Sequence, residues 1–160
     1  MLFLGIPYAS AGTLLQSGDK APDFTLKDSE GKSYTLTQYR DNYIVLYFYP
    51  KNDTPGCTQE ACNFRDNFSE LKEKGIIILG VSYDDASSHK AFREKYNLPF
   101  PLLSDTDKSV SETYGAKGLF MPKRITYLIS PEGLILHVFD NVDTQNHSQQ
   151  ILDVFNQLPK

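Results

Sequence analysis

The two cysteines of this chain, Cys57 and Cys62, lie five residues apart, directly after a turn-rich polar segment. Cysteine thiolates act as nucleophiles, as metal ligands and as oxidisable groups. All three histidines lie far along the chain from both cysteines, so the spacing is not that of a zinc site. The pair therefore indicates redox or nucleophilic chemistry, or else two unrelated buried thiols.

The residues before Cys57 favour a reactive thiolate. A helix is expected to begin near Cys57, where free backbone N–H groups and the positive end of the helix dipole stabilise an anion. The Thr54 hydroxyl either caps this helix or bonds the sulfur and an incoming oxygen, and Pro55 fixes the backbone at the entry. Gly56 either forms a tight turn or lets the backbone approach a ligand closely.

Cys62 is too far from Cys57 for a disulfide while both lie in one intact helix. Residues five apart on a helix are separated by roughly 8–9 Å between Cα atoms, whereas a disulfide needs less than about 7 Å. Either the two cysteines never bond, or the first turns of the helix must unwind before they do. The spacing also differs from that of a C-x-x-C pair, in which the helix need not open.

Buried strands and amphipathic helices alternate around this segment. Residues 43–49 form a continuous apolar run typical of a strand covered on both faces, and residues 57–74 carry one apolar stripe typical of a helix. The other expected elements are a hairpin at 24–36, strands at 76–81 and 102–103, helices at 87–96, 108–114 and 148–158, and a hairpin of strands 125–129 and 134–139. This order predicts an α/β fold with a mixed central sheet, flanking helices and an N-terminal hairpin. The turn after Tyr49 lies at the carboxyl end of its strand, where such sheets place their sites.

The composition is that of one ordinary globular domain. The chain has 160 residues, 40% of them hydrophobic, and its net charge of −4 argues against nucleic-acid binding. We expect a single domain at residues 18–160 after a leader at residues 1–17. Residues 1–11 carry no charge, and they are either a weak export signal or a segment that packs on the domain or frays. The sequence contains no apolar stretch of membrane-spanning length.

The segment from Pro50 to Cys62, PKNDTPGCTQEAC, resembles the active-site segment of peroxiredoxins, which share the pattern P-x-x-x-T-x-x-C. Its TPGCTxEAC form is similar to the subfamily called bacterioferritin comigratory protein in bacteria and peroxiredoxin Q in plants. Residues 18–24 resemble the opening of the family, and residues 124–129 resemble its arginine-bearing strand. The resemblance implies a thioredoxin-like fold and an antioxidant, thiol-dependent peroxidase that reduces hydrogen peroxide and organic hydroperoxides.

The resemblance also implies roles for five residues. Cys57 is the peroxidatic nucleophile that becomes a sulfenic acid, and Cys62 is the resolving thiol that closes an intramolecular disulfide. Thr54 bonds the peroxide, Pro50 shields the pocket from water, and Arg124 favours the thiolate and holds the polarised oxygens. Without the resemblance, Arg124 would be expected at the surface in an ion pair.

Three further residues are candidates for the substrate site. Gly56 lets the backbone approach the substrate, and Tyr49 borders the pocket from the buried strand. Glu60 lies in the first helical turn, where an acid is favourable in any case, and it also orders an arginine or the substrate. The three histidines, at positions 89, 137 and 147, are expected on the surface or in a strand.

The resemblance implies no metal or other cofactor, a thioredoxin or similar dithiol as reductant, and a monomer, because resolution occurs within one chain. No nucleic-acid or membrane partner is implied. The expected location is cytoplasmic, exported or periplasmic if residues 1–11 are part of a signal peptide, or plastid-like if the protein comes from a plant. Three other functions compete: a thioredoxin-like disulfide oxidoreductase, which would carry C-x-x-C, a copper-delivery protein, which would carry C-x3-C, and a redox sensor or holdase that binds a partner when oxidised.

Overall fold

The computed structural model describes residues 13–159, and the thirteen helices and strands of this part alternate largely as the sequence predicts. In chain order they are β1 (Thr25–Lys27), β2 (Ser33–Thr35), the 3-10 helix η1 (Thr37–Tyr39), β3 (Tyr43–Phe48), α1 (Pro55–Asp66), α2 (Phe68–Glu73), β4 (Ile76–Ser82), α3 (Ala86–Tyr96), β5 (Leu102–Ser104), α4 (Ser109–Thr113), β6 (Ile125–Ile129), β7 (Ile135–Phe139) and α5 (His147–Asn156). Among the described residues, the structure contains no helix that is long and apolar enough to cross a membrane.

The strands of the described part form one mixed sheet in the order β2-β1-β5-β4-β3-β6-β7. The central neighbours β3, β4 and β5 run parallel, and β6 and β7 close one side as antiparallel strands. β6 pairs with β3 so that Ile125, its first residue, lies opposite Phe48, the last residue of β3. This register brings Arg124, the residue directly before β6, next to the loop that follows β3.

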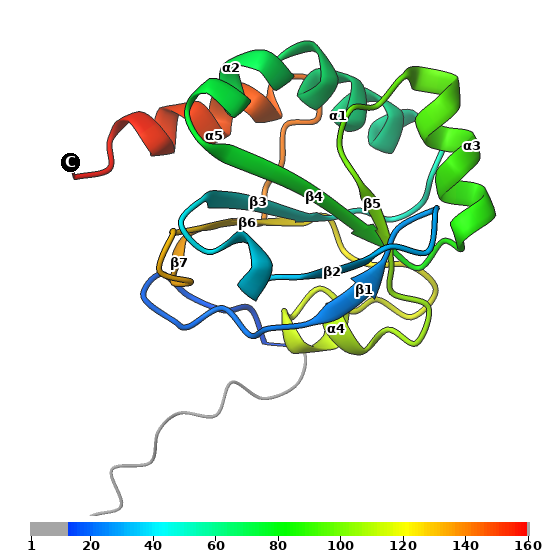
Figure 1. Cartoon of the computed structure of the whole chain (residues 1–160), viewed down its shortest axis with the longest axis horizontal. Coiled ribbons are helices and arrows are strands. Elements are labelled where there is room, and N and C mark those ends of the chain that lie inside the picture. Colours follow the sequence, from blue (N-terminus) through cyan, green and yellow to red (C-terminus); the bar gives the residue numbers. More distant parts are fainter. Residues whose placement is uncertain (1–12, 160) are drawn as a thin grey trace, which may run out of the picture.

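Helices cover both faces of the sheet (Figure 1). One face packs against α1, α2, α3 and α5, which contribute Phe64, Leu71, Phe92 and Ile151 to its core. The other face packs against α4 and the segment that precedes β1, which contribute Val110, Leu15 and Phe24 to its core. Successive residues of β3 alternate between the two cores, so this strand is buried on both sides, as its apolar run predicts.

The described part of the expected leader packs on the domain. The side chain of Leu15 is buried, and its backbone N–H donates a hydrogen bond to the Tyr127 hydroxyl at 3.1 Å. Packed structure therefore begins before Gly18, the expected start of the domain. The remainder of the leader, residues 1–12, lies outside the described residues.

The single helix expected at residues 57–74 was a wrong prediction, because the structure divides this segment into α1 and α2 at Asn67. The Asn67 backbone leaves helical geometry at ψ 12°, and its side-chain amide donates to the Asn63 carbonyl at 2.8 Å. Asparagine side chains compete in this way with the backbone bonds of a helix. The helix also begins two residues before Cys57, at Pro55, whose fixed φ suits a first helical position.

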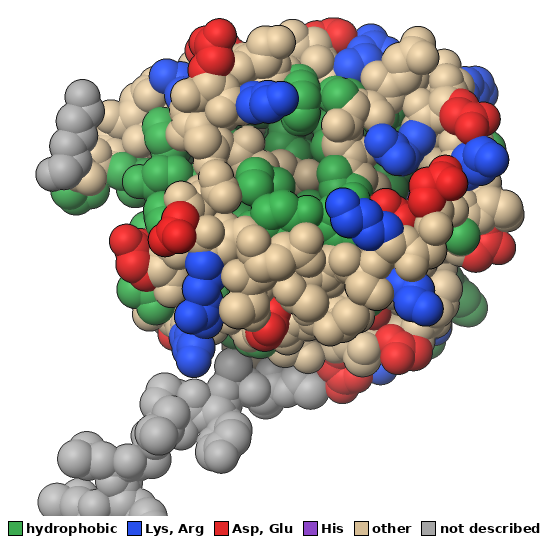
Figure 2. All heavy atoms as spheres, in the orientation of Figure 1, with side chains coloured by type: hydrophobic (Ala, Val, Ile, Leu, Met, Phe, Trp, Pro, Cys, Tyr) green, Lys and Arg blue, Asp and Glu red, His purple; other side chains and the backbone are tan. Residues whose placement is uncertain are grey.

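The exposed surface carries charges of both signs. On the face drawn in Figure 2, basic and acidic side chains are interspersed around apolar patches rather than gathered by sign. Leu119 and Phe120, in the loop between α4 and β6, are the most exposed large apolar side chains of the described residues, at 77% and 83%.

Candidate active site

The loop between β3 and α1 carries Cys57 to the carboxyl end of β3. Thr54 takes the N-cap position of α1 with an extended backbone, and Cys57 is the third residue of the helix. The first backbone bond of the helix runs from the Thr58 N–H to the Thr54 carbonyl at 2.8 Å. The N–H groups of Gly56 and Cys57 therefore precede the helical bonding pattern and point from the helix N-terminus, where they favour an anion.

A buried hydrogen-bond network fixes this loop. The Asn52 backbone N–H donates to Asp84 at 3.0 Å, and the Asn52 side-chain amide donates to Nδ1 of His89 at 2.9 Å. The Tyr49 hydroxyl donates to the Asn52 side-chain oxygen at 2.6 Å. The loop before Cys57 is thus held to Tyr49, directly after β3, and to α3.

His89 completes this network from the interior, so the expectation of a surface or strand position was wrong for it. Its side chain is fully buried, and Nε2 donates to the Leu103 carbonyl at 3.1 Å, which leaves Nδ1 as the acceptor for Asn52. Burial lowers the pKa of His89, so the ring is neutral at pH 7. His89 lies one helical turn before Phe92 on the buried side of α3, a spacing that could have identified it.

Arg124 bridges Cys57 and Glu60. The register of β6 against β3 places Arg124 beside the loop, where Nη2 lies 3.4 Å from Cys57 Sγ and Nη1 donates to Glu60 Oε1 at 2.7 Å. Burial opposes the charge of Arg124, but Glu60 and Cys57 together raise its pKa. The site therefore holds a permanent cation against a buried sulfur.

Glu60 is fully buried behind Arg124. Burial raises the pKa of Glu60 from 4.5 to about 7, and the neighbouring Arg124 offsets only part of this effect. Nε2 of His147, which is also fully buried, lies 3.9 Å from the second carboxylate oxygen of Glu60. The expectation of a surface or strand position was therefore wrong for His147 as well. His147 lies one turn before Ile151 on the buried face of α5. Extending the apolar stripe of this helix by one turn toward its N-terminus would therefore have identified His147 as buried.

The other predicted site residues lie around this cluster. The Thr54 hydroxyl donates to the Lys51 carbonyl at 2.8 Å, so it does not cap the helix, and its lone pairs remain available to accept. Pro50 is half-buried at the end of β3, and Tyr49 is buried with its hydroxyl on Asn52. Cys62 is half-buried on the same helix as Cys57, and both thiols are free. Burial raises the pKa of Cys62.

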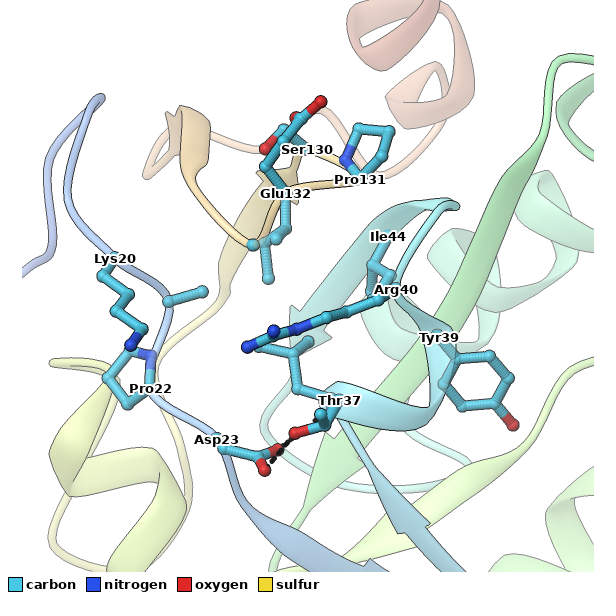
Figure 3. Close-up of a pocket in the computed structure, with 14 residues that line it drawn as sticks. Lys20, Pro22, Asp23, Thr37, Tyr39, Arg40, Ile44, Ser130, Pro131 and Glu132 are labelled. Atoms are coloured by element: carbon cyan, nitrogen blue, oxygen red, sulfur yellow. Dashed lines mark hydrogen bonds between the residues drawn. The ribbon is translucent and has the colours of Figure 1, made fainter.

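A cavity of about 410 Å³ lies at the opposite end of the sheet (Figure 3). It is bounded by Ile44 at the start of β3, Ile129 at the end of β6 and the turn at Pro131. Lys20 and Arg40 also line it. Neither cysteine lines this cavity, so it is separate from the thiol cluster.

The sequence matches the AhpC/TSA family over residues 17–138. A putative peroxiredoxin bcp of Coxiella burnetii is 44% identical over 146 residues, which cover 86% of this chain and 97% of that protein. The solved structure of peroxidoxin BcpB from Mycobacterium tuberculosis superposes with a TM-score of 0.85 at 33% identity, covering 91% of this chain and 99% of that one.

A second solved structure is that of the bacterioferritin comigratory protein of Xanthomonas campestris, described for its alkyl peroxide reduction activity. It matches with a TM-score of 0.78 at 33% identity, over 83% of this chain and 90% of that one. These matches confirm the mixed sheet with flanking helices as a thioredoxin-like fold. The chain therefore belongs to the AhpC/TSA family and is a thiol-dependent peroxidase of the peroxiredoxin type, similar to the bacterioferritin comigratory proteins.

Proposed function

We propose that this chain reduces hydrogen peroxide and organic hydroperoxides at Cys57, resolves the product with Cys62 and is recycled by thioredoxin or a similar dithiol. One observation carries the proposal: Nη2 of Arg124 lies 3.4 Å from Sγ of Cys57, at the N-terminus of a helix. A fixed cation and free N–H groups stabilise both a thiolate and the charge that develops on an attacked peroxide.

In the first step the Cys57 thiolate attacks the terminal oxygen of the hydroperoxide. The S–O bond forms as the O–O bond breaks, the sulfur is oxidised by two electrons, and the departing alkoxide or hydroxide gains a proton. Arg124 faces the reacting atoms, and the N–H groups of Gly56 and Cys57, which make no helical bond, supply further donors. The products are an alcohol or water and a Cys57 sulfenic acid.

Thr54 and Pro50 orient and shield the substrate in this proposal. Because the Thr54 hydroxyl donates to the Lys51 carbonyl, its oxygen is set to accept the hydrogen bond of the peroxide O–H. Pro50 is half-buried at the mouth of the loop and offers no N–H to compete for the substrate. Glu60 orders Arg124, and Tyr49 acts from beneath the loop through Asn52.

In the second step the Cys62 thiolate attacks Sγ of Cys57 and displaces the hydroxyl group, which leaves as water. The disulfide requires the first turns of α1 to unwind, because the Cα atoms of two residues five positions apart on a helix are farther apart than a disulfide allows. A dithiol then reduces the disulfide by thiol–disulfide exchange. Resolution within one chain is consistent with a monomer, and we propose a cytoplasmic location.

The test is peroxide consumption coupled to thioredoxin, thioredoxin reductase and NADPH, for the wild type, Cys57→Ser and Cys62→Ser. We expect turnover in the wild type, none in Cys57→Ser, and a single oxidation equivalent in Cys62→Ser until another thiol is supplied. Full turnover by Cys57→Ser would overturn the assignment of the nucleophile. Sustained turnover by Cys62→Ser with thioredoxin alone would overturn the resolving role.

A further inference from the structure

The second carboxylate oxygen of Glu60 is a buried acceptor that nothing in the proposed peroxidase mechanism uses. The Glu60 side chain is fully buried, and Oε1 accepts from Arg124 at 2.7 Å. Within the described residues, no donor lies within hydrogen-bond distance of Oε2. An ionised buried carboxylate with one bare oxygen is unfavourable, so a proton on that oxygen is the natural way to stabilise it.

His147 faces this bare oxygen with Nε2, a ring nitrogen that carries no proton. Nδ1 of His147 lies 2.8 Å from Oε1 of Gln150, an oxygen that also accepts from the Asp143 N–H, so Nδ1 must carry the ring proton. Nε2 then accepts from the Thr126 hydroxyl at 2.8 Å. Burial lowers the pKa of His147 to about 4, so the ring is neutral at pH 7.

Two acceptors, Nε2 of His147 and Oε2 of Glu60, therefore face each other at 3.9 Å. This distance is too long for a hydrogen bond, and no proton lies between the two atoms. A proton on Glu60 Oε2 would remove the repulsion between an anionic oxygen and this nitrogen, and it would compete with the Thr126 hydroxyl for the single lone pair of Nε2. A proton in this gap thus stabilises the buried Glu60 carboxyl beside His147.

The charges around the gap make this proton dependent on Cys57. The ionisable groups that face Glu60 are Arg124, Cys57, His147 and the phenols of Tyr47 and Tyr49, and Asp143 lies on the far side of His147. Burial raises the pKa of both phenols well above 10, so they are neutral. A Cys57 thiolate, an ionised Glu60 and Arg124 would leave one net negative charge in a buried site. A proton on Glu60 removes it.

We propose that Glu60 and His147 form a charge-compensating pair behind Arg124, which holds one proton while Cys57 is a thiolate and gives it up when the thiolate is oxidised. The proposal rests on the proposed role of Cys57 as nucleophile. Before the reaction, the negative charge of the Cys57 thiolate is balanced by the positive charge of Arg124, and the protonated pair is neutral. Afterwards the sulfenic acid is neutral, and the negative charge of the ionised pair is balanced by Arg124. The net charge of the buried site therefore stays at zero. The leaving oxygen gains one proton and the pair loses one. His147 touches neither Cys57 nor the substrate position and is a positioning residue that acts through Glu60.

The test counts the protons taken from solution when one equivalent of hydrogen peroxide oxidises the full chain carrying Cys62→Ser, in weak buffer near pH 6.5 with a pH indicator. If the pair supplies the proton, uptake is less than half a proton per peroxide. Adding Glu60→Gln removes the carboxyl group that holds this proton and raises the uptake from solution to roughly one proton per peroxide. His147→Gln raises it similarly, because an amide N–H then stabilises ionised Glu60. Equal uptake with and without Glu60→Gln overturns the proposal.

Two controls and a second reaction keep the result interpretable. His137→Gln, at a half-buried histidine of β7, and Glu70→Gln, at an exposed acid of α2, leave proton uptake at the level of the Cys62→Ser parent. If Glu60→Gln reacts too slowly with peroxide, iodoacetamide converts the Cys57 thiolate to a neutral thioether without needing a proton. The parent protein then releases a proton to solution and Glu60→Gln does not, whereas equal release overturns the pair.

The same mixtures separate this proposal from the proposed function. Peroxide consumption that persists in Cys57→Ser means that the proposed function has failed. Consumption that depends on Cys57, together with the same proton uptake in the Glu60 variant and its parent, means that only the charge-compensating pair has failed.

Discussion

A Cβ atom placed on Gly56 would lie 3.0 Å from Nη2 of Arg124. This nitrogen is the one that lies 3.4 Å from the Cys57 sulfur. Gly56 does not have a positive φ, so the backbone itself does not require glycine at this position. The missing side chain is what lets the guanidinium reach the sulfur, which gives Gly56 a role in the site that differs from a tight turn.

Gly56→Ala is therefore expected to slow the reaction of Cys57 with hydrogen peroxide by about 10-fold, which corresponds to about 1.4 kcal/mol of transition-state stabilisation. Alanine is the better helix former, so the free energy of unfolding should not decrease. Stopped-flow competition with a reference peroxidase measures the rate, and urea unfolding measures the stability. A rate equal to that of the wild type would contradict the steric role.

The matched control for this prediction is a double-mutant cycle with Arg124→Met. If Gly56→Ala acts only by displacing the guanidinium, it should change the rate less than twofold once that guanidinium is gone. An undiminished effect in the Arg124→Met background would mean that the extra methyl group acts on the substrate directly.

The position of Cys57 could be predicted from local sequence. The run of residues 43–49 specifies a strand buried on both faces, and the turn residues that follow end it and begin a helix with Cys57 in the first turn. Both signals depend only on neighbouring residues. The break at Asn67 was missed because an apolar stripe continues across it and only the asparagine side chain marks the change.

The partners of Cys57 could not be predicted from local sequence. Arg124 reaches the sulfur because β6 pairs with β3 in one particular register, and no local pattern encodes that register. His89 and His147 each lie one turn before an apolar residue on the buried side of a helix. This spacing is visible in the sequence and indicates that both histidines are buried. Their hydrogen-bond partners come from other elements, so burial was predictable and pairing was not.

Arg124→Lys should lower the rate of Cys57 oxidation by about 10- to 100-fold, although it keeps the charge. The guanidinium contacts Glu60 with one nitrogen and Cys57 with another, and a single ammonium group cannot occupy both positions. The measurement is the same peroxide competition. Lys123→Ala, at the exposed neighbouring residue, should react at the wild-type rate. Equal rates for Arg124→Lys and the wild type would show that charge alone suffices.

Formation of a Cys57–Cys62 disulfide should unwind the first turns of α1. In the reduced protein α1 is continuous from Pro55 to Asp66, so its amides from Thr58 onward are protected by helical hydrogen bonds. Hydrogen exchange of the oxidised protein should show faster exchange in residues 58–66 and unchanged exchange in α5, the neighbouring helix. Unchanged protection of α1 in a protein shown by mass to contain the disulfide would contradict the unwinding.

His89→Leu should lower the free energy of unfolding by about 2 kcal/mol, because it leaves the Asn52 amide without its 2.9 Å partner in a buried site. It should also slow peroxide reduction, since Asn52 fixes the loop before Cys57. The folded pKa of His89 lies below 6.5, so its contribution to stability is present above pH 6.5 and is lost as the pH falls through the folded pKa. Urea unfolding from pH 4 to 8 measures the loss of stability and its pH dependence, and peroxide competition measures the rate. His137→Leu, which breaks no buried network, serves as the control.

Glu60→Gln should change the pH dependence of stability in a specific direction. Folded Glu60 keeps its proton up to about pH 7, whereas the unfolded carboxyl loses it near 4.5, so this group makes the wild type less stable as the pH rises through that interval. The lost stability amounts to about 3 kcal/mol. His147, with a folded pKa of about 4, changes stability in the opposite direction between pH 4 and 6.5 and masks the effect in the wild type.

The difference in unfolding free energy between Glu60→Gln and the wild type removes the part of the His147 contribution that does not depend on Glu60. This difference should increase in favour of the variant by about 3 kcal/mol between pH 4.5 and 7 and then level off. The corresponding difference for Glu70→Gln, at an exposed position, should stay flat across the same interval. A flat difference for Glu60→Gln would mean that Arg124 holds Glu60 ionised throughout, and the carboxyl would then have no proton to exchange with Cys57.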